Sequence, residues 1–510
     1  MASLVFQDIS FSYPGSPVRL LDHIDFGVSE GWLGVVGANG AGKTTLLQLA
    51  CGLLAVQSGR IHRPERAVYC PQRTDAPSPE LSSLLSSFDG EAYRIRGALE
   101  IEDDFIDRWD TLSHGERKRA QIAACLWTRP TLFAIDEPTN HLDSRAQSIV
   151  FDALRTFPGV GLLVSHDREL LDRLCTNSLF VFPPTTTLRS GGYSDARAGL
   201  DAENQHILEM KQQAARHRRL LHTEMDERRQ RVRKAHKARS KRGIDRKDHD
   251  AKEKIDRARI ADGGAGKSLR QLEGRVRQAS EQEAALVVRK ERVTGISLQG
   301  RRSQRNALFS IAATELALGE DRRLTVPDLL MQPANRVALI GPNGGGKSTL
   351  VRHILSGLKL PPEEVVSIPQ EIRAEAASEV LEAVKRLAGS RLGEVMQWVS
   401  RLGSDPHQLL DSLTPSPGEV RKLMLSLRMT DAPVLLILDE PTNHMDLPSV
   451  ECLESALREY PGGLLLVSHD LRFLHALTTT TWEIVSPHGE RGSSQLIVRQ
   501  RPPEWEPSEP

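Results

Sequence analysis

Short apolar runs alternate along the chain with longer segments in which apolar positions recur at helical spacing. The runs GWLGVVG (31–37) and RVALIG (336–341) each lead into a glycine-rich loop. The segments after these loops, TLLQLA and STLVRHIL, have a helical pattern, and LLILDEP (435–441) is a short buried-strand run that ends in acidic residues. Alternation of this kind predicts an α/β fold, with a largely parallel sheet covered by helices on both faces.

The middle of the chain has a different pattern. Between about 200 and 290, apolar or small residues recur at heptad-like spacing, which predicts two long helices packed against each other. The expected seam positions are Ile207, Ala214, Leu221, Met225, Val232, Leu269, Leu272, Val276, Ala279 and Leu286. A first helix of roughly 40 residues is about 60 Å long, and the segment 243–266 is expected to form the tip of the hairpin.

The α/β pattern occurs twice. GANGAGKTT (37–45) recurs as GPNGGGKST (341–349), and LFAIDEPTNHLD (132–143) recurs as LLILDEPTNHMD (435–446). Asp439 follows Asp136 by 303 positions, and His469 follows His166 by the same distance. We therefore divide the chain into a first α/β unit at 1–194, a helical-hairpin linker at 195–302, a second α/β unit at 303–495 and a Pro/Glu-rich tail at 496–510.

Both glycine-rich loops match the phosphate-binding pattern G-x-x-x-x-G-K-[ST]. In such a loop backbone N–H groups surround the phosphates, the lysine reaches the terminal phosphates and the hydroxyl holds Mg²⁺. The nucleotide-binding residues predicted here are Gly37, Ala38, Asn39, Gly40, Ala41, Gly42, Lys43, Thr44 and Thr45, and Gly341, Pro342, Asn343, Gly344, Gly345, Gly346, Lys347, Ser348 and Thr349. A chance glycine-rich turn is the alternative for an isolated match. ADGGAGKS (261–268) is such a case, because Ala261 replaces the first glycine and no apolar strand precedes it.

A pair of acidic residues follows a short apolar strand in each repeat. Asp136 and Asp439 are expected to help hold Mg²⁺. Glu137 and Glu440 are placed to orient or deprotonate an attacking water. Capping of the next helix is the structural alternative for such a pair, but PTNH follows in both copies.

A histidine ends another strand in each unit. His166 and His469 both stand in VSHD and suit a hydrogen bond to the γ-phosphate. A purely structural histidine is the default interpretation of either one alone, but the two recur at the same offset as the acids. We therefore include both histidines among the catalytic residues.

These residues resemble those of ATP-binding cassette ATPases, over both repeats and about three quarters of the chain. The resemblance implies that Gln72 and Gln370 sense Mg²⁺ and nucleotide. It also implies a signature motif, seen here as LSHGE (112–116) and PSPGE (415–419), which contacts the γ-phosphate through its serine and its last glycine. The signature residues carried over are Ser113, Gly115, Glu116, Ser416, Gly418 and Glu419. His114 and Pro417 replace the middle glycine, and proline lacks an N–H donor.

In that family two cassettes enclose two ATP molecules, and each phosphate loop faces the other cassette's signature. The resemblance therefore groups Lys43, Gln72, Glu137 and His166 with Ser416 and Gly418 in site 1, and the equivalent second set with Ser113 and Gly115 in site 2. One chain is then expected to function as a monomer and to hydrolyse ATP at both sites. Tyr13 resembles the family's adenine-stacking aromatic, whereas Ala317 stands at the same distance before the second loop. Stacking contributes about 0.5–1.5 kcal/mol, so site 2 is expected to hold adenine less tightly.

Composition excludes several classes of protein. No apolar run approaches the ~18 residues needed to span a bilayer, and MASLVFQDIS lacks the features of a signal peptide. The 5 cysteines are scattered and contain no C-x-x-C pair, which argues against a disulfide framework or zinc site and favours a cytoplasmic location.

Positive charge is concentrated in the linker although the whole chain is neutral, with 67 basic and 67 acidic residues. Residues 211–270 contain 21 Lys or Arg against 9 Asp or Glu. A solvated coiled-coil face is the structural alternative, but it needs no single sign of charge. With few aromatic residues, the segment suits folded or double-stranded RNA recognised through its backbone. The RNA-binding candidates are Arg231, Arg233, Lys234, Lys237, Arg239, Lys241 and Arg242.

Two cassettes with a long basic linker resemble the ABC-F family of ribosome-binding proteins. The resemblance implies binding at the ribosomal E site, with the linker reaching toward 23S rRNA, the P-site tRNA and the peptidyl transferase centre. Family members are translation factors or ribosome-protecting antibiotic resistance proteins. Ser113 follows Gln72 by only 41 positions, which leaves little room for an arm insertion, and a short tail follows the second cassette. These features resemble the resistance branch.

The sequence leaves three alternative functions open. The first is a housekeeping translation factor of the same family, the second is the ATPase subunit of a transporter with a separate membrane chain, and the third is a DNA-repair or chromosome-organising ATPase. The basic linker disfavours the transporter, and the lack of zinc-type cysteine pairs disfavours the DNA-associated ATPase.

Overall fold

The computed structural model describes residues 2–15, 17–140, 142–238, 270–286, 300–319, 322–370, 372, 374–404, 406, 409, 416–485 and 493–500. Helix α7 (Tyr193–Ala238) is described to its end, but its side chains only as far as Gln230 and at Arg233. Contacts between Cα atoms divide the chain into two units. One consists of Met1–Ala196 and Arg292–Pro510, and the other is Arg197–Glu291.

The first cassette is built on a six-stranded sheet with the order β5-β6-β7-β3-β8-β9. The strands β5 (Ala67–Cys70), β6 (Leu132–Asp136), β7 (Val160–Val164), β3 (Gly31–Gly37) and β8 (Cys175–Phe182) are parallel, and β9 (Thr185–Ser190) is antiparallel to β8. A separate antiparallel sheet contains β2 (Leu21–Ser29), β1 (Ser3–Phe11) and β4 (Ser58–His62). The helices are α1 (Lys43–Cys51), α2 (Pro79–Ser86), α3 (Gly90–Ala98), α4 (His114–Trp127), α5 (Ser144–Arg155) and α6 (Arg168–Leu174).

The second cassette repeats this topology. Its strands β15 (Val365–Ile368), β16 (Leu435–Asp439), β17 (Gly463–Val467), β14 (Arg336–Ile340) and β18 (Thr480–Val485) lie in the same order as β5-β6-β7-β3-β8 and are also parallel. The sheet continues through β19 (Ser493–Arg499), β12 (Arg323–Val326) and β11 (Thr314–Ala317), while β10 (Phe309–Ile311) pairs with β13 (Leu329–Met331). The helices are α9 (Lys347–Gly357), α10 (Ala374–Lys385), α11 (Gly389–Arg401), α13 (Pro417–Met429), α14 (Leu447–Arg458) and α15 (Leu471–Leu477). Strand β19 extends to Arg499, into the segment predicted as tail.

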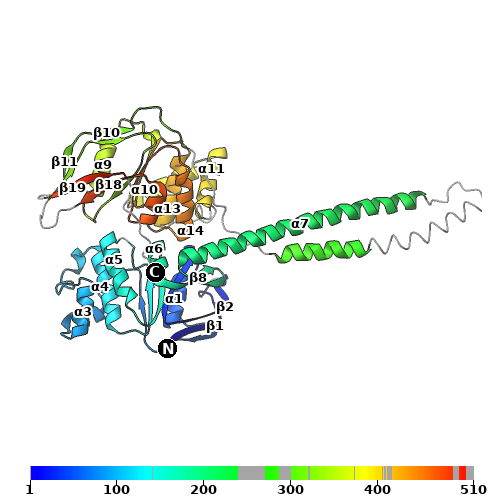
Figure 1. Cartoon of the computed structure of the whole chain (residues 1–510), viewed down its shortest axis with the longest axis horizontal. Helices are drawn as coiled ribbons and strands as arrows, with labels where there is room; N and C mark the ends of the chain where they lie inside the picture. The colour runs from blue at the N-terminus through cyan, green and yellow to red at the C-terminus, as the bar shows by residue number, and fades with distance from the viewer. Residues whose placement is uncertain are drawn as a thin grey trace, which may run out of the picture. The chain divides into compact units, whose positions relative to one another are not determined.

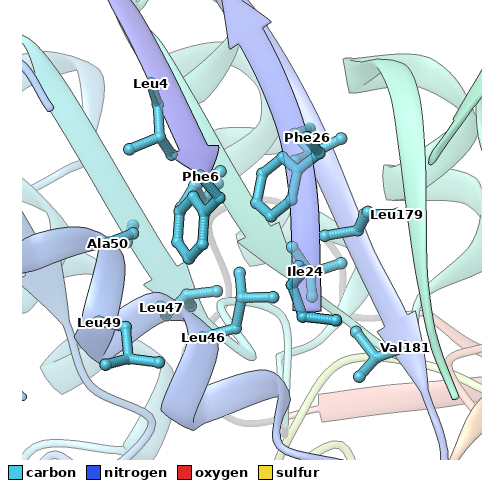
Figure 2. Close-up of a cluster of buried hydrophobic side chains, with 14 of the residues drawn as sticks. Leu4, Phe6, Ile24, Phe26, Leu46, Leu47, Leu49, Ala50, Leu179 and Val181 are labelled. Atoms are coloured by element: carbon cyan, nitrogen blue, oxygen red, sulfur yellow. The ribbon is translucent and has the colours of Figure 1, made fainter. Parts of the chain in front are cut away.

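The core of the first cassette fixes the helix that follows the phosphate loop. Figure 2 shows Phe6 and Phe26, from β1 and β2, facing Leu46 and Leu47 of α1. The two phenylalanine rings stack with centroids 4.4 Å apart. Because both leucines are fully buried, the N-terminus of α1 is held at the carboxyl end of the parallel sheet, where ligands bind in open α/β folds.

The described part of the linker unit forms an antiparallel helical pair, as its heptad-like apolar positions predict. Helix α7 is 46 residues long, and residues 270–285 form a second helical segment beside it (Figure 1). Cross-helix ion pairs join Arg218 to Glu283 (2.6 Å) and Arg229 to Glu273 (2.8 Å), so the second segment runs opposite to the first. The buried cluster between the two consists of Leu221, Met225, Leu272, Val276 and Ala279.

The other seam positions are less informative. Ile207, Ala214 and Leu286 are half-buried. The side chain of Val232, residue Leu269, the predicted tip and the loop at 261–268 lie outside the described residues.

Candidate nucleotide sites

Glycines close the two phosphate loops where other residues do not fit. Gly42 and Gly346, which precede α1 and α9, have φ values of 95° and 106°, a left-handed conformation that favours glycine. A Cβ atom on Gly37 would lie 2.7 Å from the carbonyl oxygen of Val181. The loops therefore approach neighbouring backbone closely and direct N–H groups at the start of each helix toward an anion.

The loop lysines occupy equivalent positions. Lys43 Nζ donates to the carbonyl oxygens of Gly37 (2.9 Å) and Ala38 (3.1 Å). Lys347 Nζ donates to those of Gly341 (2.7 Å) and Pro342 (3.2 Å). Burial lowers the pKa of both ammonium groups.

A hydroxyl and a carboxylate meet beside each lysine. Thr44 Oγ1 donates to Asp136 Oδ2 at 2.7 Å, and Ser348 Oγ donates to Asp439 Oδ2 at 3.2 Å. Mg²⁺ is usually held by one or two carboxylates together with substrate phosphates. These oxygen pairs fit that chemistry, and no group of three or more His, Cys, Asp or Glu that could hold a metal ion occurs in the described part of the chain.

The two glutamates next to these aspartates have an unusual backbone. Glu137 and Glu440 both have φ of 47°, a left-handed conformation that is rare outside glycine and recurs at functional sites. Each donates its backbone N–H to a residue of the adjacent strand, Val164 or Val467, at 2.8 Å. Burial raises the pKa of both carboxyl groups to about 8. Oε1 of each is buried and forms no hydrogen bond with another described residue, although a histidine nitrogen lies within 3.6 Å of it.

The histidines face these carboxyl groups. His166 Nε2 lies 3.2 Å from Glu137 Oε1, and His469 Nε2 lies 3.6 Å from Glu440 Oε1. Burial lowers the imidazole pKa to about 3 for His166 and about 4 for His469. Both rings are therefore neutral at physiological pH and are able to donate one hydrogen bond each.

Residues of both cassettes line one cavity of about 590 Å³. The first cassette contributes phosphate-loop residues, Gln72, Glu137 and His166, and the second contributes Ser416 and Gly418. This is the set that the sequence assigns to site 1. Gln370, Glu440 and His469 line the same cavity.

Two equivalent hydrogen bonds join the cassettes at the phosphate loops. Asn39 N donates to Asp446 Oδ2 at 2.7 Å, and Asn343 N donates to Asp143 Oδ2 at 3.3 Å. The second bond connects the loop of site 2 with the cassette that carries Ser113 and Gly115. Lys347, Ser348, Ser113 and Gly115 are not among the described residues that line the 590 Å³ cavity.

Both signature motifs begin a helix. Ser113 caps α4 and Ser416 caps α13, each in a capping box with the glutamate three residues later. Glu116 and Glu419, expected to contact nucleotide, therefore accept hydrogen bonds from the serine backbone and hydroxyl. Pro417 is the first residue of α13, a position whose N–H has no partner within the helix, so proline is compatible there.

The two cassettes have different residues where the sequence predicts the adenine ring. Tyr13 lines the cavity, and its hydroxyl lies 2.9 Å from Thr45 Oγ1. In the second cassette Leu318 N, just after β11, donates to the carbonyl oxygen of Arg322, just before β12, at 2.7 Å. Arg322 donates to the carbonyl oxygen of Gly344 at 2.9 Å, so a guanidinium lies against the second loop.

The structure brings to the sites several residues that the sequence motifs do not identify. Asp143 and Asp446, which form the cross-cassette bonds, recur in NHLD and NHMD at the offset already used for the acids, so the repeat itself could have identified them. Lys118 and Arg421 are buried cations at equivalent positions of α4 and α13. Nothing in their own pattern distinguishes them from surface charges.

The structure describes only some of the residues predicted to bind RNA. Arg233 is exposed on α7. Arg231, Lys234 and Lys237 belong to α7, but their side chains, and all of Arg239, Lys241 and Arg242, lie outside the described residues. Where the structure is described, none of its helices is both long and apolar enough to cross a membrane.

Comparison with known families defines the class of protein. The model of the family described as "ABC transporter" matches residues 21–140 and 324–443, one match in each repeat. The archaeal ribosome recycling factor aABCE1, solved with the ribosomal stalk protein aP1, has a TM-score of 0.62 at 19% identity, over 96% of this chain and 89% of that one. With the two phosphate loops, these matches define an ATP hydrolase built from two ATP-binding cassettes.

Curated relatives narrow the class. The chain is 30% identical to the tylosin resistance ATP-binding protein TlrC of Streptomyces fradiae, over 91% of this chain and 94% of TlrC. It is 28% identical to the ribosome protection protein VmlR of Bacillus subtilis, over 94% of this chain and 86% of VmlR. The energy-dependent translational throttle protein EttA of Mycobacterium tuberculosis is 25% identical over 94% of this chain and 89% of EttA. The chain belongs to the ABC-F family of ATP-binding cassette proteins.

Proposed function

We propose that this ATPase binds the ribosome at the E site in its ATP-bound state. The hairpin reaches toward 23S rRNA, the P-site tRNA and the peptidyl transferase centre, and it protects the ribosome from antibiotics that act on the large subunit. The observation that carries the proposal is the basic hairpin, with 21 Lys or Arg against 9 Asp or Glu over residues 211–270, in a chain with two cassettes. The names of VmlR, TlrC and EttA support it, because two are resistance or protection proteins and one acts on translation.

ATP binding uses the phosphate loop of one cassette and the signature of the other. Lys43 and the loop N–H groups hold the phosphates at site 1, and the Ser416 hydroxyl and Gly418 N–H approach from the second cassette. At site 2 the corresponding groups are Lys347, Ser113 and Gly115. The hydroxyl–carboxylate pairs, with Gln72 and Gln370, would hold Mg²⁺, and the ion would neutralise phosphate charge when bound. Because a bound ATP touches both cassettes, it stabilises their closed arrangement.

Hydrolysis needs a general base for the attacking water and a hydrogen-bond donor to the oxygens of each γ-phosphate. Glu137 and Glu440 orient the attacking water and accept its proton. A pKa of about 8 in the nucleotide-free protein places each carboxyl group near physiological pH, which suits proton transfer. The neutral imidazoles of His166 and His469 donate a hydrogen bond to phosphate oxygen.

Contacts between the cassettes extend to the first turn of the linker helix. Tyr193, the first residue of α7, is buried and donates its hydroxyl to Glu451 Oε1 of α14 at 2.5 Å. Arg472 of α15 donates to Ser194 Oγ at 2.6 Å and to Asp172 Oδ2 at 3.1 Å. Opening of the cassettes must break these bonds, so closure by ATP acts on the start of the helix that enters the hairpin.

Sedimentation with ribosomes tests the proposal. The Glu137→Gln, Glu440→Gln double variant should bind ATP without hydrolysing it and should pellet with 70S ribosomes only when ATP is present. Reversal of Arg231, Arg233, Lys234 and Lys237 to Glu should abolish the pelleting, as should high salt, because phosphate contacts release counterions.

Four arginines on the cassettes provide a control with the same change in net charge. Arg94, Arg145, Arg323 and Arg386 have side chains that are 63%, 76%, 72% and 78% exposed, and their reversal to Glu should leave pelleting in place. Equal binding of the double variant to duplex DNA or to membranes contradicts ribosome binding and favours the other classes of ATPase.

Antibiotic tolerance tests the protective role. Expression of the protein should raise tolerance to lincosamides, pleuromutilins, streptogramins A or macrolides. Unchanged inhibitory concentrations for all four classes identify a housekeeping translation factor instead.

A further inference from the structure

Two buried cations lie behind the nucleotide sites and have no role in the mechanism above. Lys118 of α4 is 0% exposed and Arg421 of α13 is 3% exposed. Each stands five residues after its signature serine, Ser113 or Ser416. The two are equivalent in the repeat but differ in residue type, so the position keeps a positive charge while the side chain changes.

In the first cassette the lysine joins two segments of site 1. Lys118 Nζ donates to the carbonyl oxygen of Pro71 (2.7 Å), which precedes Gln72, and to the carbonyl oxygen of Asp136 (3.2 Å), which precedes Glu137. It also donates to Gln121 Oε1 at 3.1 Å, and Gln121 Nε2 donates to the carbonyl oxygen of Arg73 at 2.9 Å. The backbone on both sides of Gln72 is thus fixed to α4.

In the second cassette the arginine joins the equivalent two segments and contacts one further backbone carbonyl. Arg421 Nη2 donates to the carbonyl oxygen of Gln370 at 2.5 Å. Its Nη1 donates to the carbonyl oxygens of Glu440 (2.9 Å) and Asn443 (2.8 Å).

All the oxygens that these two cations contact in these bonds belong to neutral groups, backbone carbonyls and one side-chain amide. A buried charge without a direct ion pair is expensive, and replacing such groups by apolar residues of similar volume is often neutral or stabilising. Stability alone therefore does not explain a cation at this place in both cassettes. Their hydrogen bonds instead have a geometric effect. Each cation fixes the backbone beside the glutamine and the backbone beside the catalytic glutamate of its own cassette to one helix.

We propose that Lys118 and Arg421 are positioning residues for hydrolysis: each fixes the backbone of Gln72 or Gln370 relative to that of Glu137 or Glu440. The proposal rests on the roles given to these glutamines and glutamates above. Loss of the cation should leave ATP binding through the phosphate loop intact, but it should weaken the Mg²⁺ dependence carried by the glutamine and slow the chemical step.

Introducing the same substitution into two parent variants distinguishes a role in positioning catalytic groups from a general folding defect. In Glu440→Gln only site 1 hydrolyses ATP, and in Glu137→Gln only site 2 does. Lys118→Met should slow single-turnover hydrolysis about 10–100-fold in the first background, the range for residues that orient ligand groups, and less than about 3-fold in the second. It should raise the Mg²⁺ concentration for half-maximal rate while ATP binding in EDTA stays unchanged. Lys118→Arg should restore most of the rate, because arginine already serves this position in the second cassette.

Arg117→Met is the matched control. Arg117 lies on the same helix and also donates to backbone carbonyls, those of Trp109 (2.9 Å) and Asp110 (2.8 Å), which are not part of either site. It should leave single-turnover rates near those of its parent. Equal rates for Lys118→Met and Arg117→Met in the Glu440→Gln background overturn the proposal, as does an equal loss in both backgrounds.

The parent variants keep this result distinct from the proposed function. If Glu440→Gln alone abolishes turnover at both sites, or if the double variant still hydrolyses ATP, the assignment of the glutamates is wrong. If the Lys118→Met variant does not fold, the proposal is tested with Arg421→Lys in the Glu137→Gln parent variant instead. Lysine offers one donor nitrogen where Arg421 donates through both Nη1 and Nη2, so about a 10-fold slower rate at site 2 is expected, and an unchanged rate overturns the proposal.

Discussion

The two signature glycines offer a matched pair of substitutions with different expected costs. A Cβ atom on Gly418 would lie 2.5 Å from the carbonyl oxygen of His444, a backbone atom. A Cβ atom on Gly115 would lie 3.1 Å from Leu142 Cδ2, the end of a flexible side chain. The same methyl group must therefore displace backbone in one cassette and only a side-chain methyl in the other.

The magnitudes follow from these contacts. Forcing an extra methyl into a packed region costs about 1–3 kcal/mol, whereas alanine in place of glycine within a helix gains about 0.5–1 kcal/mol. Gly418→Ala should destabilise the protein by about 1–2 kcal/mol, and Gly115→Ala should change stability by less than about 0.5 kcal/mol. His444 O also accepts a hydrogen bond from Asn39 Nδ2 at 3.2 Å, so its displacement should weaken the contact between the cassettes at site 1.

Calorimetry of the nucleotide-free protein measures this difference. At about 2–4 °C per kcal/mol for a domain of this size, Gly418→Ala should lower the midpoint of thermal unfolding by roughly 2–8 °C. Gly115→Ala should stay within about 2 °C of the unsubstituted protein. ATP affinity at site 1 should fall only for Gly418→Ala. Equal midpoints for the two variants refute the reasoning, because the steric difference is then not present in solution.

Three further predictions concern charge, stacking and the hairpin. Burial raises the pKa of Glu137 and Glu440 to about 8 from an ordinary 4.5, so their contribution to stability is full below about pH 4.5 and is lost as pH rises through about 8. Glu137→Gln should therefore raise the unfolding midpoint of the nucleotide-free protein more at pH 9 than at pH 5, and a constant difference contradicts this. Tyr13→Ala should weaken ATP binding at site 1 about 2–12-fold, from a stacking energy of about 0.5–1.5 kcal/mol, and an unchanged titration argues against stacking. Leu272→Ala, at a position 2% exposed, should destabilise the hairpin by about 2–5 kcal/mol, seen as faster amide exchange around Leu221 with ATPase activity unchanged; unaltered exchange contradicts the packing.

The repeat made much of the fold and of the sites predictable. Each phosphate loop and each acid-ended strand occurs twice in the same order, so local patterns that are ambiguous alone support each other. The heptad seam likewise identified Leu221, Met225, Leu272, Val276 and Ala279, because burial of a helical pair depends on short-range spacing. Both results rest on interactions that a few consecutive residues determine.

The features that sequence did not predict depend on distant parts of the chain. The bond between Asn39 and Asp446 joins residues 407 positions apart. The positive φ of Glu137 accompanies a backbone hydrogen bond to the neighbouring strand, and no local pattern marks a glutamate for that conformation. Lys118 resembles a surface residue by type, yet it is fully buried because carbonyl groups of two other segments converge on it.

The central claim is that ATP closes the cassettes and that the closed form is the one that binds the ribosome. Thermodynamic reciprocity then requires ribosomes to tighten ATP binding by the same factor by which ATP tightens ribosome binding. The direct measurement is the ATP dissociation constant of the Glu137→Gln, Glu440→Gln variant with and without 70S ribosomes at low ionic strength. We expect ribosomes to lower it by at least about 10-fold, equivalent to about 1.4 kcal/mol of coupling. An ATP affinity that ribosomes leave unchanged contradicts the account.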